Sequence, residues 1–184
     1  ARASIGDGAI IGTGASIGAR ASIGARASIG DGAIIGTGAS IGEDASIGDG
    51  AMIGTGASIG NRASIGARAS IGDGASIGDG ASIGDGASIG EDASIGDGAM
   101  IGDGASDAID LGWADGYRKC VCQVHGVAYI GAGCRWFTLG DAIRHWENKP
   151  DRETTMCLMM AALHIAYLRG WSLEDEGTYP TNIL

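Results

Sequence analysis

The sequence predicts a mainly β protein in which a long β-solenoid is followed by a small α+β domain. Seventeen isoleucines recur at an interval of six from Ile5 to Ile101, with no insertion between them, and a fixed short period is the signature of a solenoid. Each repeat also has the composition of one short strand and one turn. The composition then changes abruptly, because all four Trp, all four Cys, all three His and the single Phe lie after residue 106. We therefore expect a rod over 1–106 and a second domain over 107–184.

The repeating unit reads Ala-Ser-Ile-Gly-x-x, as in residues 3–8. In an extended strand the Ala and the Ile point to one side and the Ser between them points to the other. The Gly and the variable pair, most often Asp-Gly, supply a turn, because Gly reaches positive φ at low cost and Asp bonds its own backbone. An α-helix is excluded, since each Gly inside it would cost about 1 kcal/mol and a period of six would carry the Ile around the axis.

Read from the isoleucine, the unit is Ile-Gly-Asp-Gly-Ala-Ser, and this pattern resembles the repeat of the bacterial transferase hexapeptide family. The resemblance implies a left-handed parallel β-helix with three strands per coil, and so 18 residues per rung, over residues 1–106. For the acyltransferases of the family it implies a trimer with a catalytic His in a cleft between subunits. For the related carbonic anhydrases it implies three His ligands for a metal.

The chemistry of those relatives has no counterpart in the rod, which contains no His, Cys or Lys and no aromatic residue. It therefore offers no obvious general base for activating a hydroxyl or an amine. We expect no catalytic, cofactor-binding or metal-ligating residue and no enzymatic activity. The predicted function is structural: a rigid shaft or filament subunit of a phage or cell-surface appendage, with 107–184 setting the register and mediating self-assembly or attachment.

Residues that are 18 apart in the sequence should stack on successive rungs, so this offset predicts which corners lie above one another. Arg26, Asp44 and Arg62 fall in one column, and Arg68 lies between two acids on a neighbouring corner. Exposed pairs of this kind contribute only a few tenths of a kcal/mol each, so we expect them to oppose slippage of one rung past another. Elsewhere acids stack on acids, but too few oxygens converge there to predict a Ca²⁺ site.

Four apolar residues replace the outward-facing Ser. Ile10 and Met100 fall on one face and Ile34 and Met52 on the next, which suits contact with another copy of the rod; the alternative is that they are scattered exposed residues. The segment 156–166 leaves almost no polar face, and a helix that is apolar all round is buried, here beneath another subunit. The residues expected to associate there are Met156, Met159, Met160 and Leu163.

The second domain is expected to begin with a β-hairpin. Residues 117–124 and 127–130 alternate or run apolar around His125-Gly126, which predicts two strands joined by a two-residue turn. A third short strand is expected near 134–137. The domain is acidic, at net −3, and the rod is at net −7.

Two helices are expected to follow the strands. Thr138 has the position of an N-cap for a short helix that runs to about Glu147, where Asn-Lys-Pro ends it. Asp151 would cap a longer helix through Arg169, with Gly170 as its stop. This helix is too interrupted to predict a membrane span.

The four cysteines leave three interpretations open: free buried thiols, two disulfides, or a zinc site with His125 or His145. No Cys-x-x-Cys knuckle signals a metal. The positions are Cys120, Cys122, Cys134 and Cys157. A nucleophilic pair of Cys134 with His145 lacks any family signature. An acyltransferase-like enzyme is the third hypothesis for the function, and its catalytic residue would be one of the three histidines, His125, His145 or His164.

The second hypothesis for the function is recognition of a carbohydrate or protein receptor by exposed Trp side chains, with the rod as a spacer. The residues concerned are Trp113, Trp136, Trp146 and Trp171. Nucleic acid and anionic membrane surfaces are poor partners for an acidic chain. The expected partners are the protein itself, as a trimer or an end-to-end filament, and a surface receptor.

Overall fold

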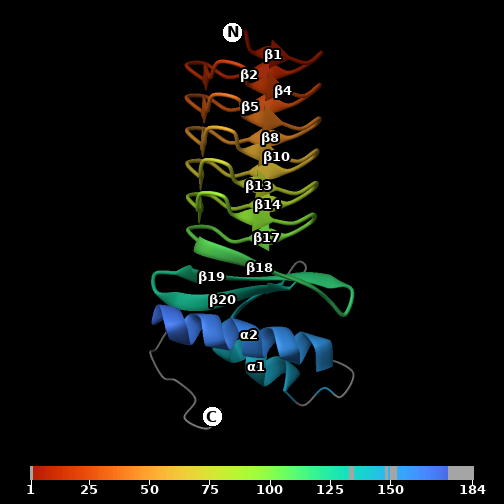
Figure 1. Cartoon of the computed structure of the whole chain (residues 1–184), viewed down its shortest axis with the longest axis vertical. Helices are drawn as coiled ribbons and strands as arrows, with labels where there is room; N and C mark the ends of the chain where they lie inside the picture. Colours follow the sequence, from red (N-terminus) through yellow and green to blue (C-terminus); the bar gives the residue numbers. More distant parts are fainter. Residues whose placement is uncertain (1, 133–134, 148, 150–152, 174–184) are drawn as a thin grey trace.

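The computed structural model describes the chain apart from residues 1, 133–134, 148, 150–152 and 174–184. Figure 1 shows a rod of stacked coils that ends on a layer of longer strands, beyond which two helices lie. The mainly β class is confirmed: a solenoid of about six turns is followed by a small α/β region with two helices.

Each hexapeptide of the rod contributes one strand of two residues. The strands are β1 Ser4–Ile5, β2 Ile10–Ile11, β3 Ser16–Ile17, β4 Ser22–Ile23, β5 Ser28–Ile29, β6 Ile34–Ile35, β7 Ser40–Ile41, β8 Ser46–Ile47, β9 Met52–Ile53, β10 Ser58–Ile59, β11 Ser64–Ile65, β12 Ser70–Ile71, β13 Ser76–Ile77, β14 Ser82–Ile83, β15 Ser88–Ile89, β16 Ser94–Ile95 and β17 Met100–Ile101. Corners of four residues separate them, as the repeat predicts.

Every third strand pairs in parallel, with an offset of 18 residues. Ser58 of β10 lies beside Ser76 of β13, and Ile59 lies beside Ile77. The N–H of Ser58 donates to the carbonyl oxygen of Ala75 at 2.8 Å, and each rung repeats this bond to the next. The result is two six-stranded sheets and one nine-stranded sheet, so the predicted rung of three hexapeptides is confirmed.

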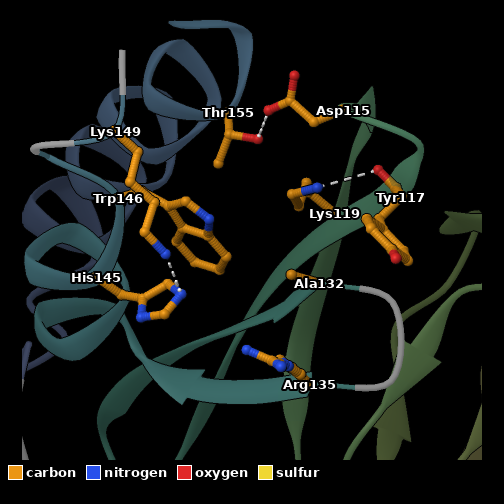
Figure 2. A pocket seen from close by; sticks show the side chains of 9 residues that line it. All are labelled: Asp115, Tyr117, Lys119, Ala132, Arg135, His145, Trp146, Lys149 and Thr155. Atoms are coloured by element: carbon orange, nitrogen blue, oxygen red, sulfur yellow. Dashed lines mark hydrogen bonds between the residues drawn. The ribbon is translucent and has the colours of Figure 1, made fainter. Parts of the chain in front are cut away.

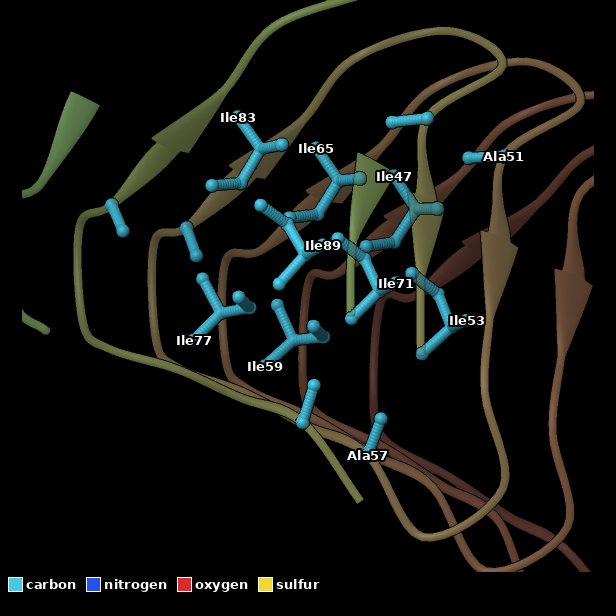
Figure 3. Packing of buried hydrophobic residues seen from close by; sticks show 14 of the residues in the cluster. Ile47, Ala51, Ile53, Ala57, Ile59, Ile65, Ile71, Ile77, Ile83 and Ile89 are labelled. Carbon is cyan, nitrogen blue, oxygen red and sulfur yellow. The ribbon is translucent and has the colours of Figure 1, made fainter. Parts of the chain in front are cut away.

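The interior of the rod consists of stacked Ile and Ala. From Ile23 to Ile101 no repeat isoleucine is more than 3% exposed, and Figure 3 shows Ile47, Ile65 and Ile83 following one another in a column. Burial of one such side chain contributes about 1.5–3 kcal/mol. Because each rung touches only its neighbours, the stability of the rod is close to a nearest-neighbour sum.

Where one rung stacks on the next, the glycine after the isoleucine is required by their close approach. A Cβ on Gly60 would lie 2.5 Å from the backbone N of Asp79 and 2.5 Å from the carbonyl C of Gly78. The second glycine of the unit has a different role, because it takes positive φ at the corner, as at Gly80 with φ 65°. Arg62 occupies the same left-handed position with φ 58°, a conformation that disfavours residues with a Cβ.

The corner carboxylates are bonded to the backbone of the preceding rung. Oδ1 of Asp79 accepts the N–H of Asn61 at 2.7 Å, and Oδ1 of Asp85 accepts the N–H of Ala67 at 2.8 Å. Asn61 does the same through its amide oxygen for the N–H of Glu43, at 2.8 Å. At these corners an acceptor oxygen one rung away satisfies the backbone N–H, and a carboxylate and an amide both supply it.

The nine-stranded sheet continues without a break from the rod into the longer strands. These are β18 Ser106–Ala114, β19 Tyr117–Val124, β20 Val127–Ala132 and β21 Arg135–Thr138. β18 pairs in parallel with β15 of the last complete rung and antiparallel with β19, so it belongs to both parts of the molecule. The hairpin around His125-Gly126 and the third strand are found as predicted. β18 was not predicted, because the hexapeptide pattern stops at its first residue.

The helices are α1, Leu139–Trp146, and α2, Glu153–Arg169. The Thr138 hydroxyl accepts the N–H of Asp141 at 3.2 Å, which confirms the predicted N-cap, and Gly170 takes φ 68° after α2. The predicted cap Asp151 lies outside the described residues. Among the described helices, none is long and apolar enough to cross a membrane.

The layer of longer strands is buried on both faces. Cys120 and Cys122 point into the end of the rod and belong to its core, whereas Val121 and Ile130 belong to a second core with the helices. The Cys120 thiol donates to the carbonyl oxygen of Met100 at 3.0 Å. A sheet covered on both sides has nearly continuous apolar strands, which explains the weak alternation of β19 in the sequence.

The open end of the last rung is closed by side chains from the β18–β21 layer. The Arg118 guanidinium lies where a further rung would stack on Gly96, and the N–H of Gly96 donates to Oδ2 of Asp110 at 3.0 Å. Arg118 and Asp110 also form an ion pair. The indole of Trp136 covers Gly102, where a Cβ would lie 2.9 Å from the ring. These groups replace the contacts that a following coil would supply.

We expect Trp136→Ala to lower the free energy of unfolding by about 2 kcal/mol, less than a fully buried Trp would, because the indole is half-buried. It would also expose the rung at Gly102 to solvent. Denaturant titration measures the first effect, and amide hydrogen exchange of the last rung measures the second. Trp113→Ala, at a Trp that is 60% exposed, is the control. Equal effects of the two changes would contradict the capping role.

Candidate functional site

A cavity of about 360 Å³ lies between the β18–β21 layer and the two helices. Figure 2 shows its lining, in which basic side chains enter from three different elements. The lining residues are Asp115, Tyr117, Lys119, Ala132, Arg135, His145, Trp146, Lys149 and Thr155. This volume is in the range of small-molecule sites.

His145 stands in the last turn of α1 and is held by aromatic contacts. Its ring stacks on Phe137 with centroids 5.5 Å apart and meets Trp146 edge to face at 4.9 Å. Nζ of Lys149 lies 2.8 Å from Nε2. An ammonium group has donors only, so Nε2 is the acceptor in this bond and the ring proton lies on Nδ1. The imidazole therefore presents its basic nitrogen toward Lys149, on the cavity side (Figure 2).

Lys119 is the most deeply placed charge in the wall, at 2% exposed. Its Nζ donates to the carbonyl oxygens of Ala114, at 2.8 Å, and Tyr117, at 3.2 Å. On the α2 side of the cavity, the Thr155 hydroxyl donates to Oδ2 of Asp115. This bond ties the start of α2 to the turn between β18 and β19, so it fixes one side of the cavity.

The predicted register charges lie on the rod, far along the chain from this cavity. Arg26 bonds Oδ1 of Asp44 at 2.7 Å and Oε1 of Glu43 at 2.5 Å. The bond to the Arg26 guanidinium lowers the pKa of Asp44. Within the described part of the chain, Arg62 and Arg68 form no ion pair, and only their backbone N–H groups bond the neighbouring rung. One of the proposed columns is thus linked by side chains.

The apolar residues on the rod are exposed, as expected of outward positions. Ile34 and Met52 are neighbours on adjacent rungs of one sheet, 50% and 49% exposed. Ile10 and Met100 lie at opposite ends of another sheet, five pairings apart. The first pair forms a small continuous patch and the second does not.

The expected association residues of α2 have the i, i+3, i+4, i+7 spacing of one helix face, but they differ in exposure. Met160 is 44% exposed, Met156 and Leu163 are half-buried, and Met159 is fully buried against the second core. Met159 therefore offers no surface to another subunit. The outer side of this helix remains open at Tyr167 within the chain, so the covering subunit stays a prediction.

The four Trp side chains differ in exposure. Trp113 is 60% exposed, Trp136 is half-buried in the cap, and Trp146 and Trp171 are buried. Trp146 lines the cavity; the other three do not. The structure therefore does not gather them into a single aromatic surface.

The described cysteines are free. Burial raises the pKa of the Cys120 thiol to about 12 and also raises the pKa of Cys122, so neither is a ready nucleophile. Cys157 is exposed. Cys134, and with it the pairing with His145, lies outside the described residues. In the parts of the chain that the structure describes, no cluster of three or more His, Cys, Asp or Glu could hold a metal ion.

Of the three histidines, His145 alone lines the cavity, since His125 is exposed in the β19–β20 turn and His164 is exposed on α2. Sequence reasoning named His145 but missed the basic residues around it. Two signals were available: Lys149 follows His145 by one helical turn, and Lys119 alternates with the rod-facing Cys120 and so points to the helix side of β19.

The comparisons with known proteins concern mainly the rod. The model of the bacterial transferase hexapeptide (six repeats) matches residues 26–61, 38–73 and 74–106. The acetyltransferase domain of PglB from Neisseria gonorrhoeae, also solved with acetyl coenzyme A, is 31% identical over 56% of this chain and 50% of its own, with a TM-score of 0.55. A GDP-perosamine N-acetyltransferase from Caulobacter crescentus is 29% identical over 56% of this chain and 49% of its own, also at 0.55. The chain thus spans about half the length of these relatives.

One solved structure is similar over nearly the whole chain. A hexapeptide transferase family protein from Anaplasma phagocytophilum covers 91% of this chain and 92% of its own at 20% identity, with a TM-score of 0.53. This likeness concerns the fold alone. A search of the curated proteins found no match.

These likenesses overturn the prediction of a non-enzymatic shaft or filament subunit, and with it the fibre and appendage interpretations. The solved structures that the rod resembles at 31% and 29% identity are acetyltransferases. The prediction was wrong because it gave the absence of His from the rod more weight than the resemblance to acyltransferases, although it kept an enzyme with a catalytic His from 107–184 as its third hypothesis. The repeat segment of this chain is a left-handed β-helix built from bacterial transferase hexapeptide repeats.

Proposed function

We propose that the protein is an acyltransferase-type enzyme, which moves an acyl group from a thioester of coenzyme A to an amine or hydroxyl. The observation that carries this proposal is the likeness of the rod to acetyltransferases, one of them solved with acetyl coenzyme A. The rod itself has no His, Cys or Lys that could act as a general base near neutral pH. The cavity beside it supplies one in His145, so we place the proton transfer there.

The reaction at this site follows from the position of the imidazole. The acceptor nitrogen attacks the thioester carbonyl carbon. Nε2 of His145 takes the proton that the nitrogen loses once the Lys149 ammonium, which lies 2.8 Å from Nε2, has turned away and freed its lone pair. The C–S bond then breaks, and the proton passes from the imidazole to the leaving thiolate. Contacts with Phe137 and Trp146 hold the ring. The imidazole is therefore already oriented before the acceptor binds.

The direct test is release of free thiol from acetyl-coenzyme A by the full chain, measured with a thiol reagent against a panel of primary amines, amino sugars and alcohols. We expect release that depends on the acceptor and exceeds the rate without protein. Mass spectrometry of the acceptor would show the added acetyl group. If no acceptor accelerates thiol release and acetyl-coenzyme A does not bind in calorimetry, the proposal is wrong.

We also propose that the protein self-associates through the patch of Ile34 and Met52. Hexapeptide-repeat proteins often form trimers, and these two side chains form the continuous apolar surface on the described rod faces. Removing such surface from water contributes about 25 cal/mol per Å². A second copy of the same face is therefore the expected partner.

Changing both patch residues to serine restores the repeat consensus, so we expect the fold to be kept and the oligomer to dissociate. Light scattering after size exclusion measures the mass of each species. Ile10→Ser is the control, since that residue lies alone at the far end of another sheet, and we expect no change in mass. A wild-type monomer, or equal masses for wild type and double variant, would contradict the patch as the interface.

A further inference from the structure

We propose that the cavity is a binding site for a phosphate group, carried by a small-molecule ligand. It lies in 107–184, outside the residues that the family model matches, and the likeness that extends over this segment, at 20% identity, concerns the fold alone. The proposal deepens the proposed function, because it identifies a chemical group that one of the two reactants carries. The binding site can exist whether or not acyl transfer takes place there.

The first argument is the concentration of positive charge. Three of the seven Lys and Arg residues of 107–184 line this one cavity, although the segment is acidic overall. They come from β19, β21 and the connection after α1, so the tertiary fold brings them together. Among the described lining residues Asp115 is the acidic one, and its carboxylate is engaged by the Thr155 hydroxyl.

The second argument is the geometry of the donors. Arg135 projects into the cavity from the start of β21 (Figure 2), and within the described residues its guanidinium forms no ion pair. The guanidinium fork matches two oxygens of a phosphate. Nζ of Lys149 lies opposite, on the His145 side, and is accessible because this residue is exposed. Lys119 adds a fixed charge from the buried wall.

The third argument is the relation of these charges to the imidazole. A phosphate held between Arg135 and Lys149 leaves the rest of its molecule within the same cavity as His145. The bound phosphate therefore anchors the ligand and places its reacting group near Nε2. Binding groups remote from the reacting atoms have this role in catalysis. Either the acyl acceptor or the coenzyme can carry this group.

The test measures binding of inorganic pyrophosphate to the full chain by calorimetry at low salt, with no acyl donor present. We expect Arg135→Gln and Lys149→Gln each to weaken binding about tenfold, as loss of one charge-assisted contact does. Arg144→Gln is the matched control. It makes the same charge change on α1, but Arg144 bonds Asp141 at 2.8 Å on the exposed side and does not line the cavity, so we expect no more than a twofold change.

Two further ligands distinguish the source of the phosphate. Competition by phosphoethanolamine would assign the site to an acceptor, and competition by adenosine 3′,5′-bisphosphate would assign it to the coenzyme. The proposal is overturned if pyrophosphate does not bind at millimolar concentration, or if Arg144→Gln weakens binding as much as Arg135→Gln. Pyrophosphate binding without thiol release would leave this site standing and count against acyl transfer, so the two failures are separable.

Discussion

Gly60→Ala is expected to lower the free energy of unfolding by about 3 kcal/mol or more, from one added methyl group. The Cβ would lie 2.5 Å from the backbone N of Asp79 and equally close to the carbonyl C of Gly78. Both obstacles are backbone atoms in a ladder that is bonded at 2.8 Å on each rung, so neither can move without separating two coils. Denaturant titration, followed by circular dichroism, measures the loss.

Gly90 provides the control for this substitution. It has the same place in the hexapeptide, but no atom lies within 4 Å of a Cβ built on it, because the next rung is absent there. We expect Gly90→Ala to change stability by less than about 0.5 kcal/mol. If both substitutions cost the same, the cause would be an intrinsic preference for Gly after Ile, and close stacking of the rungs would not be the reason for the repeat.

His145→Asn is expected to reduce the rate of acyl transfer by about 10²–10⁴-fold, since positioned proton acceptors contribute that much. Asparagine has no basic nitrogen, and a change in KM is not expected if the imidazole acts on the proton alone. Steady-state thiol release, with kcat and KM determined separately, gives the result.

His164→Asn removes the same group from the exposed side of α2, and its rate should equal that of the wild type. A His145→Asn variant that keeps its rate would remove the imidazole from the mechanism. An equal loss in both variants would indicate damage to the packing of the helices, which a melting curve would reveal independently.

The rod was predictable to the residue, because one six-residue pattern determines strand, corner and register together. Each Ile points inward, each Ser outward, and the 18-residue offset follows from three equal sides. β18 was not predictable in the same way. Its first residue completes the last hexapeptide, and its pairing with β19 depends on a surface that only the folded rod presents. Both faces of β19 are buried, which weakened its alternation, but the His125-Gly126 turn and the apolar run still predicted the strand.

The cavity was predictable only in part. His145 was named as a candidate because the chain has three histidines, and no local pattern distinguished it from the other two. Lys119, Arg135 and Lys149 are separated by 14 to 16 residues, with no periodicity to connect them. Their convergence depends on how β21 and α1 fold back over β19, a tertiary arrangement that no local pattern specifies.

The charge of the rod can change without a change in its fold, because the bonds at these corners require an acceptor oxygen and not a charged group. Asn61 accepts the same backbone N–H from the preceding rung that aspartates accept elsewhere, so the bond needs an oxygen and no charge. The number of carboxylates in these columns can therefore vary widely while every coil keeps its place. Substitutions at single corners can therefore change the net charge of the rod from strongly negative to nearly neutral while the fold stays the same. Its solubility and the long-range electrostatic field of its surface would change with that charge.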